Sequence, residues 1–185
     1  MDCSIIKMIL FLSIILCTII GALIWRALCA YYNIPWPYFL AFWLENPYMK
    51  IFANPWQFIQ NANPKQQHRI LEIGSGAGRI LLRAAKHTNF KADFVGIDLQ
   101  KNMIALTRKK LQHIQKKNID SDNLKIKLLT GSFNQKTLID HPFLNQYFDQ
   151  VYLVTVLGEV PDKVEFLKTA KQTLAPGGSI FIQEV

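Results

Sequence analysis

The stretch RILEIGSGAGRI, residues 69–80, constrains the fold of this chain more than any other part of the sequence. An apolar run is followed at once by the alternating glycines Gly74, Gly76 and Gly78. Glycine leaves room for a ligand against the backbone and adopts turns that are closed to other residues. A strand, a tight turn and a helix in this order predict a ligand site where the turn leaves a sheet.

Strands and helices alternate along the rest of the chain. Short apolar runs predict strands at residues 68–73, 92–98, 123–131, 148–156 and 179–185. Helical spacing of apolar residues predicts helices between them, at residues 78–88, 100–117 and 161–174. Ala175-Pro-Gly-Gly178 is expected to end the last helix. This alternation predicts an α/β fold, in which a parallel sheet carries helices on both faces.

The N-terminal part of the chain holds a long, strongly apolar run without charge. Residues 8–25 would form a helix about 27 Å long, close to the thickness of a bilayer core. Lys7 and Arg26 flank it with side chains that reach the interface. A cleaved signal peptide is the rival interpretation, but its apolar region is usually shorter and the sequence WRALCAYY is a poor cleavage site. We expect residues 1–30 to be a membrane anchor with one transmembrane helix; a buried helix of a soluble protein is the other alternative.

Aromatic residues crowd the segment that follows, residues 31–66. Trp and Tyr favour the boundary between membrane and water, because one side of the ring is apolar and the other polar. Prolines divide the segment into short pieces, at Pro35, Pro37, Pro47 and Pro55. We expect an interfacial collar of short helices against the headgroups, or an aromatic lid on the soluble domain; the two are compatible.

Two acidic residues indicate which ligand suits the glycine turn. A dinucleotide fingerprint, G-x-G-x-x-G, requires glycine where this chain has Arg79. Glu72 stands two residues before the first glycine, where a carboxylate repels a pyrophosphate but attracts an ammonium group. Asp98 ends the second strand, where it is placed to accept hydrogen bonds from ribose hydroxyls. These features favour a nucleoside that carries an amino acid, and they disfavour a nicotinamide-dependent oxidoreductase.

At this point the chain resembles the class I S-adenosylmethionine-dependent methyltransferases. The segments that carry the resemblance occur in order: ILEIGSGAG, VGIDLQKNMI, FDQVYLVTV and LAPGGSIFIQEV. Together they cover residues 67–185, for which the resemblance implies a Rossmann-like fold and S-adenosylmethionine as cofactor. VTVLGEVPD followed by LAPGG looks like the branch that contains small-molecule, quinone and phospholipid methyltransferases.

The resemblance also implies which residues contact the cofactor. The turn residues Gly74, Ser75, Gly76 and Gly78 would let the backbone approach it. Glu72 would help to hold its amino-acid end, and Asp98 its ribose. The remaining expected contacts are Leu99 and Met103 beside the adenine, Ser132 and Phe133 after the third strand, and Val154 and Thr155 facing the methyl donor. Ser132 stands where the family often has an acidic residue.

The end of the chain departs from the family pattern. Such folds normally finish with two further strands, whereas this chain stops at Val185 in the fifth strand. We therefore expect an incomplete domain with an open sheet edge, which a partner could cover. No catalytic residue is predicted, because alignment of the acceptor with the methyl group supplies much of the rate. A non-catalytic protein that keeps the fold and binds the cofactor or a partner is the second hypothesis.

Charge and composition limit the kinds of partner that we expect. The net charge of +8 favours anionic membrane surfaces or nucleic acid. The three cysteines lie in or beside the apolar helix and the four histidines lack metal-ligand spacing, so we expect no metal. A membrane helix makes nucleic acid a poor partner. The leading hypothesis is a single-pass membrane methyltransferase, with its domain on the cytoplasmic side, that acts on a hydrophobic or lipid-like small molecule.

Overall fold

A computed structural model of the chain describes residues 3–32, 54–87, 91–117 and 124–184. The chain divides into two compact units, Met1–Trp36 and Pro37–Val185. Most of the predicted aromatic collar, residues 33–53, lies outside the described residues.

The first unit is the helix α1 (Cys3–Tyr32). Within it, Ile5–Trp25 is a span of 21 residues with a mean hydropathy of 2.7, and none of this span is buried. The hydroxyls of Ser13 and Thr18 donate to the carbonyl oxygens three residues earlier, at 2.8 and 2.7 Å, so they need no partner outside the helix. The span is long and apolar enough to cross a membrane, a property that an N-terminal signal sequence would share.

The second unit is built on a parallel five-stranded sheet with the order β3-β2-β1-β4-β5. The strands are β1 (His68–Ile73), β2 (Ala92–Asp98), β3 (Leu124–Thr130), β4 (Phe148–Val154) and β5 (Leu174–Gln183). The chain moves outward from β1 to β3 on one side and returns to the other side of β1 with β4. The carboxyl end of β1 is therefore the point where the strand order reverses, which is where open α/β sheets bind ligands.

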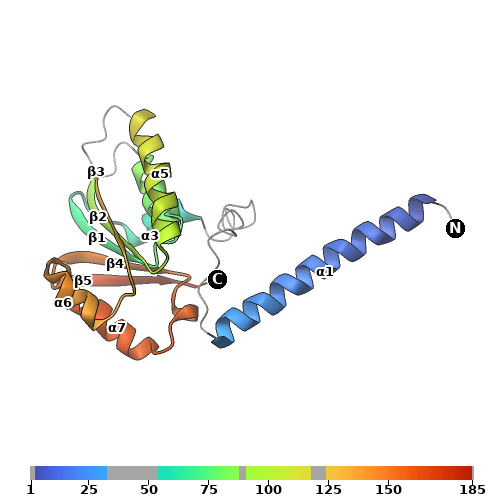
Figure 1. The fold of residues 1–185 in the computed structure, drawn as a ribbon. Coiled ribbons are helices and arrows are strands. Elements are labelled where there is room, and N and C mark those ends of the chain that lie inside the picture. Colours follow the sequence, from blue (N-terminus) through green and yellow to red (C-terminus); the bar gives the residue numbers. More distant parts are fainter. Residues whose placement is uncertain (1–2, 33–53, 88–90, 118–123, 185) are drawn as a thin grey trace. The chain divides into compact units, whose positions relative to one another are not determined.

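Helices cover both faces of the sheet, as Figure 1 shows. One face packs against α3 (Pro55–Ala62), α4 (Arg79–Ala85) and α5 (Lys101–Lys117). The other face packs against α6 (Gln135–Asp140), the short 3-10 helix η3 (Pro142–Leu144) and α7 (Lys163–Gln172). Successive residues of a strand serve opposite faces, so Ile70 and Leu71 are both fully buried but belong to different cores. This is the architecture that the sequence predicts.

The last part of the aromatic segment, helix α3, belongs to the core of this unit. The ring of Phe58 packs edge-on against Tyr152 of β4, with ring centroids 5.0 Å apart. A second contact joins α3 to β4: the side-chain amide of Gln150 donates to the carbonyl oxygen of Ala62 at 2.8 Å, and this bond is buried. Burial of Phe58 in this core accounts for an aromatic residue in α3 without any contact with a membrane.

One predicted boundary is wrong. The sequence pattern predicts that Ala175–Gly178 ends the last helix, but α7 already ends at Gln172. The cap is Thr173, whose hydroxyl donates to the carbonyl oxygen of Ala170 at 2.7 Å. The hydroxyl of Thr173 therefore caps the helix, a role that the sequence pattern assigns to glycine.

The segment Ala175–Gly178 instead forms a bulge inside β5. Phe148 pairs with Leu174, whereas Gln150, two residues on, pairs with Ser179, so β5 carries extra residues between these pairs. Close packing against β4 explains one glycine of the bulge: a Cβ at Gly178 would lie only 2.9 Å from the carbonyl oxygen of Phe148.

Candidate functional site

The glycine turn, residues 74–78, joins β1 to α4 and is tied to the end of β2. The backbone N–H groups of Gly74 and Ser75 both donate to the carbonyl oxygen of Ile97, at 2.8 and 3.0 Å. The turn then closes on itself, because the N–H of Gly78 donates to the carbonyl oxygen of Ser75 at 2.8 Å. The sequence motif thus forms a fixed loop at the carboxyl edge of the sheet.

Asp98, at the end of β2, connects three segments of this edge. Its Oδ2 accepts from the N–H of Gly76 at 2.7 Å and its Oδ1 accepts from the N–H of Gln100 at 2.8 Å. Its carbonyl oxygen accepts from the N–H of Gly131, after β3, at 2.9 Å. Burial raises the pKa of the Asp98 carboxyl, and the two N–H groups partly offset this. Each carboxylate oxygen keeps a second lone pair, which leaves capacity for ligand hydroxyls.

Glu72 lies beneath the turn and is only 3 % exposed. Its carboxyl group accepts a hydrogen bond from the backbone N–H of Leu81, in the first turn of α4. Burial raises the pKa of Glu72 from 4.5 to about 8, and the Leu81 bond and the charge of Arg79 only partly oppose this. At neutral pH the ligand-free protein therefore holds this carboxyl mainly in its protonated form.

Two buried polar atoms of this site have no hydrogen-bond partner among the residues that the structure describes: Glu72 Oε2 and Ser75 Oγ. A buried polar atom without a partner destabilises a protein by about 1–3 kcal/mol. Such atoms mark a place where a ligand can supply the missing bonds. A ligand ammonium group would satisfy the Glu72 oxygen, which is the chemistry expected from the sequence.

Helix α5 contributes a residue that sequence reasoning missed. Thr107 is fully buried, and its hydroxyl donates to the carbonyl oxygen of Gly76 at 3.0 Å. Its methyl group also requires the glycine at position 78, since a Cβ there would lie 2.6 Å from Thr107 Cγ2. Its spacing from Met103 and Leu111 indicates that position 107 is on the inward face of the helix, but not that it contacts the glycine turn.

The segment after β4 reaches the turn from the other side. The side chain of Val156 packs on Gly74, so that a Cβ at Gly74 would lie 2.0 Å from Val156 Cγ2. The φ angle of 71° at Gly74 independently favours glycine. The sequence predicts that Val154 and Thr155 face this space and does not single out Val156. It includes Val156 in the predicted strand 148–156, whereas β4 ends at Val154.

This geometry fits the family that the sequence suggested. Residues 64–185 match the family model described as a methyltransferase domain. The chain belongs to this methyltransferase family. The ubiquinone/menaquinone biosynthesis C-methyltransferase UbiE of Wigglesworthia glossinidia brevipalpis is 27% identical over 135 residues, which are 73% of this chain and 49% of that protein. The chain spans about half the length of the curated relatives that it matches first.

Solved structures agree with this assignment. A SAM-dependent methyltransferase from Aquifex aeolicus has a TM-score of 0.64 at 19% identity, over 80% of this chain and 72% of that one. Haemonchus contortus phosphoethanolamine N-methyltransferase 2, solved with S-adenosyl-L-methionine, has a TM-score of 0.51 at 20% identity, over 71% of this chain and 27% of that one. The predicted family and Rossmann-like fold are confirmed, and S-adenosylmethionine, the predicted cofactor, is the one named for both structures.

The other predicted cofactor contacts of the methyltransferase domain divide into exposed and buried side chains. Leu99, next to Asp98, is 57% exposed and free to face a ligand. Met103 is only 3% exposed and packs with Ala77 and Leu106, so its side chain supports the turn from within the protein. Their expected contacts with the adenine stay predictions.

The same division holds for the predicted contacts after β3 and at the end of β4. The hydroxyl of Ser132 accepts from the side-chain amide of Asn134 at 3.0 Å and is exposed. The ring of Phe133 packs edge-on against Phe166 of α7, with 5.5 Å between centroids, and lies partly buried against the core on that face of the sheet. Val154 packs with the core on the opposite face. The expected contacts of these residues with the cofactor also stay predictions.

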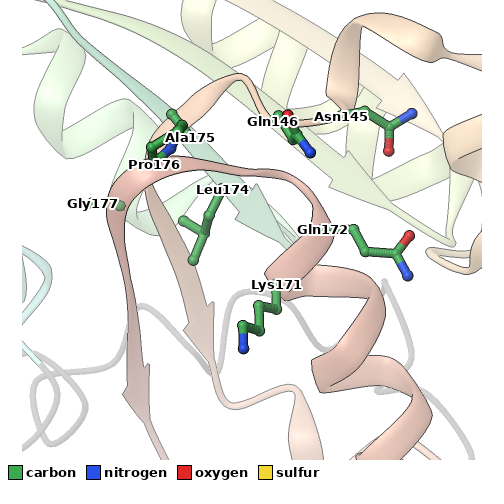
Figure 2. Close-up of a pocket in the computed structure, with 9 residues that line it drawn as sticks. Asn145, Gln146, Lys171, Gln172, Leu174, Ala175, Pro176 and Gly177 are labelled. Carbon is green, nitrogen blue, oxygen red and sulfur yellow. The ribbon is translucent and has the colours of Figure 1, made fainter.

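A cavity of about 620 Å³ lies elsewhere in the methyltransferase domain, beside the β5 bulge (Figure 2). It is lined by Asn145, Gln146, Lys171, Gln172, Leu174, Ala175, Pro176, Gly177 and Gly178. These residues come from the segment before β4, the end of α7 and the start of β5. They lie where β4 and β5 begin, whereas the glycine turn follows the carboxyl end of β1. All strands of the sheet are parallel, so the cavity lies at the amino-terminal ends of the strands and the glycine turn at their carboxyl ends. The cavity contains none of the predicted site residues.

Proposed function

We propose that the domain binds S-adenosylmethionine at the glycine turn and transfers its methyl group to an acceptor. The observation that carries this proposal is the buried Oε2 of Glu72, which has no partner among the described residues. On binding, Glu72 would release its proton to solvent and accept a hydrogen bond from the ammonium group of the cofactor. The carboxylate form, which is disfavoured in the ligand-free protein, would then be paired with a positive charge.

Asp98 is the second anchor of the proposed site. Because the N–H groups of Gly76 and Gln100 fix both of its oxygens, the carboxylate is oriented before any ligand arrives. A carboxylate held in this way accepts hydrogen bonds from two neighbouring hydroxyls, such as those of a ribose, with little further loss of side-chain freedom. This supports a nucleoside as the ligand and gives Asp98 a role in binding.

The cofactor supplies a sulfonium methyl group, which is intrinsically reactive. The role of the protein is therefore to bind the methyl donor, to orient it and to exclude water. The fixed turn, Asp98 and the segment after β4 serve the first two tasks. Orientation of two reactants is worth about 7–11 kcal/mol of a barrier, so no acid or base is required of the described residues.

We further propose that the acceptor is a hydrophobic or lipid-like molecule and that the chain acts at a membrane from its cytoplasmic side. The apolar span Ile5–Trp25 supports attachment to a membrane. The net charge of +8 supports attraction to anionic lipid. The name of the UbiE relative, a quinone C-methyltransferase, supports an apolar acceptor. Cytoplasmic placement follows from where the methyl donor is made.

The test is to feed methyl-labelled methionine to cells with and without the full-length gene and to extract lipids, protein and RNA separately. We expect gene-dependent label in the lipid extract. Label that depends on the gene but appears only in protein or RNA would refute the lipid-like acceptor. No gene-dependent label in any fraction would favour the second candidate, a protein that binds the cofactor without turnover.

A further inference from the structure

The loop that leaves β4 has an unusual backbone. We call residues 155–157 the β4 exit loop. Thr155 has a φ angle of 54°, in the left-handed region that β-branched residues seldom adopt. A residue in this region costs of order 1–3 kcal/mol and persists only where its surroundings fix it. The β4 exit loop must therefore be held by contacts from another segment.

Those contacts come from the end of β5. The N–H of Thr155 donates to the carbonyl oxygen of Gln183 at 2.8 Å, which continues the pairing of β4 with β5. The next two N–H groups, of Val156 and Leu157, both donate to Oε1 of Glu184, at 3.1 and 3.0 Å. A single carboxylate oxygen thus accepts two consecutive backbone donors, a charge-assisted arrangement stronger than neutral bonds.

The β4 exit loop in turn shapes the glycine turn. The side chain of Val156 lies on Gly74, in the place that a Cβ at this glycine would need. Movement of the loop would therefore change the space above the first glycine of the site. The contacts run without a gap from Glu184 through the backbone of Val156 to Gly74.

We propose that Glu184 is a positioning residue for the cofactor site. Its carboxylate accepts from the N–H groups of Val156 and Leu157 and so holds the β4 exit loop in place after the left-handed Thr155. This keeps Val156 against Gly74, which sets one wall of the site before the cofactor binds. This inference rests on the proposed binding of S-adenosylmethionine at the glycine turn. Glu184 acts through the loop and needs no contact with the cofactor.

The test uses the full chain in detergent and calorimetric titration with S-adenosylhomocysteine. Glu184→Ala removes the acceptor, so we expect affinity to fall about tenfold, which is about 1.4 kcal/mol. Glu184→Gln keeps an acceptor oxygen at the same position and should restore most of the affinity. The matched control is Asp162→Ala, which removes another carboxylate that accepts a backbone N–H, here of Glu165 at the start of α7. It should lower thermal stability without changing affinity.

A second readout requires no ligand. Amide hydrogen exchange of Val156 and Leu157 should become at least about tenfold faster in Glu184→Ala, about 1.4 kcal/mol of lost protection. It should stay near the wild-type rate in Glu184→Gln and in Asp162→Ala.

Unchanged exchange in Glu184→Ala, or an affinity loss no larger than that of Asp162→Ala, would overturn the inference. Tighter binding by Glu184→Ala would also overturn it, because Val156 would then be obstructing the site. A wild-type chain that binds no S-adenosylhomocysteine would instead refute the proposed function, and the exchange rates would still decide whether Glu184 holds the loop.

Discussion

Replacing Glu72 by glutamine should make the ligand-free protein more stable at neutral pH and weaken its binding of the cofactor. The amide keeps an oxygen that can accept from the N–H of Leu81, but it carries no ionisable group. Because the pKa of Glu72 is raised to about 8 from 4.5, the folded protein keeps a proton over this range that the unfolded chain has lost. Unfolding then releases a proton, so wild-type stability falls as pH rises between these two values.

The size of the effect follows from the pKa values. Where the folded protein binds one proton more than the unfolded chain, the free energy of unfolding of the wild type falls by about 1.4 kcal/mol for each pH unit. The neutral amide of Glu72→Gln binds no proton and adds no pH dependence. Between about pH 5.5 and about pH 7.5, two units, Glu72→Gln should therefore gain about 2.7 kcal/mol relative to the wild type. Water or structural relaxation near the carboxyl would reduce this figure, so it is an upper value.

The assay is urea denaturation of both full-length proteins at the two pH values, followed by circular dichroism. Other titrating groups are common to both proteins and cancel in the difference. A difference in unfolding free energy that does not change with pH would refute the buried, protonated state of Glu72. In parallel, Glu72→Gln should bind S-adenosylhomocysteine at least tenfold more weakly, since the loss of a charged hydrogen bond is worth about 1.5–3 kcal/mol. Equal affinity would refute its role in holding the ammonium group.

Three further results are expected. Asp98→Ala should weaken binding of S-adenosylhomocysteine by about 1.5–3 kcal/mol in calorimetry, and unchanged affinity would exclude its role as a ribose anchor. Gly78→Ala should destabilise the protein by more than Gly76→Ala in thermal unfolding. Both glycines have positive φ angles, but only the added Cβ at position 78 would collide with the side chain of Thr107; equal losses would contradict that packing. Carbonate washing should leave the full-length chain in the membrane pellet, and its release would rule out a spanning helix.

The sequence predicts the framework of the site because the pattern there is local. Strand β1, the glycine turn and helix α4 follow one another without interruption, and Glu72 and Asp98 are fixed by their places at strand ends. Each of these positions depends on the strand period and on the requirement of a tight turn for glycine. Long-range pairing is not needed to infer them, and the structure places both carboxylates at the turn.

The supporting contacts could not be predicted because they depend on packing between distant segments. Thr107 comes close to the glycine turn only when α5 packs against the turn. In the sequence, nothing distinguishes this threonine from the other polar residues of a helix. Phe133 follows β3 as expected, but its ring packs on Phe166 of α7, a contact between segments far apart in the sequence. The bulge at Ala175–Gly178 depends on the register between β4 and β5, which hydrophobic pattern alone does not specify.

The most direct test of this account is calorimetric titration of the detergent-solubilised full chain with S-adenosylhomocysteine and, separately, with NAD. We expect saturable binding of S-adenosylhomocysteine with one site for each chain, accompanied by proton release because Glu72 must ionise to pair with the ammonium group. The proton release would appear as a dependence of the measured heat on the ionisation enthalpy of the buffer. Binding of NAD without binding of S-adenosylhomocysteine would contradict the proposed ligand of the glycine turn.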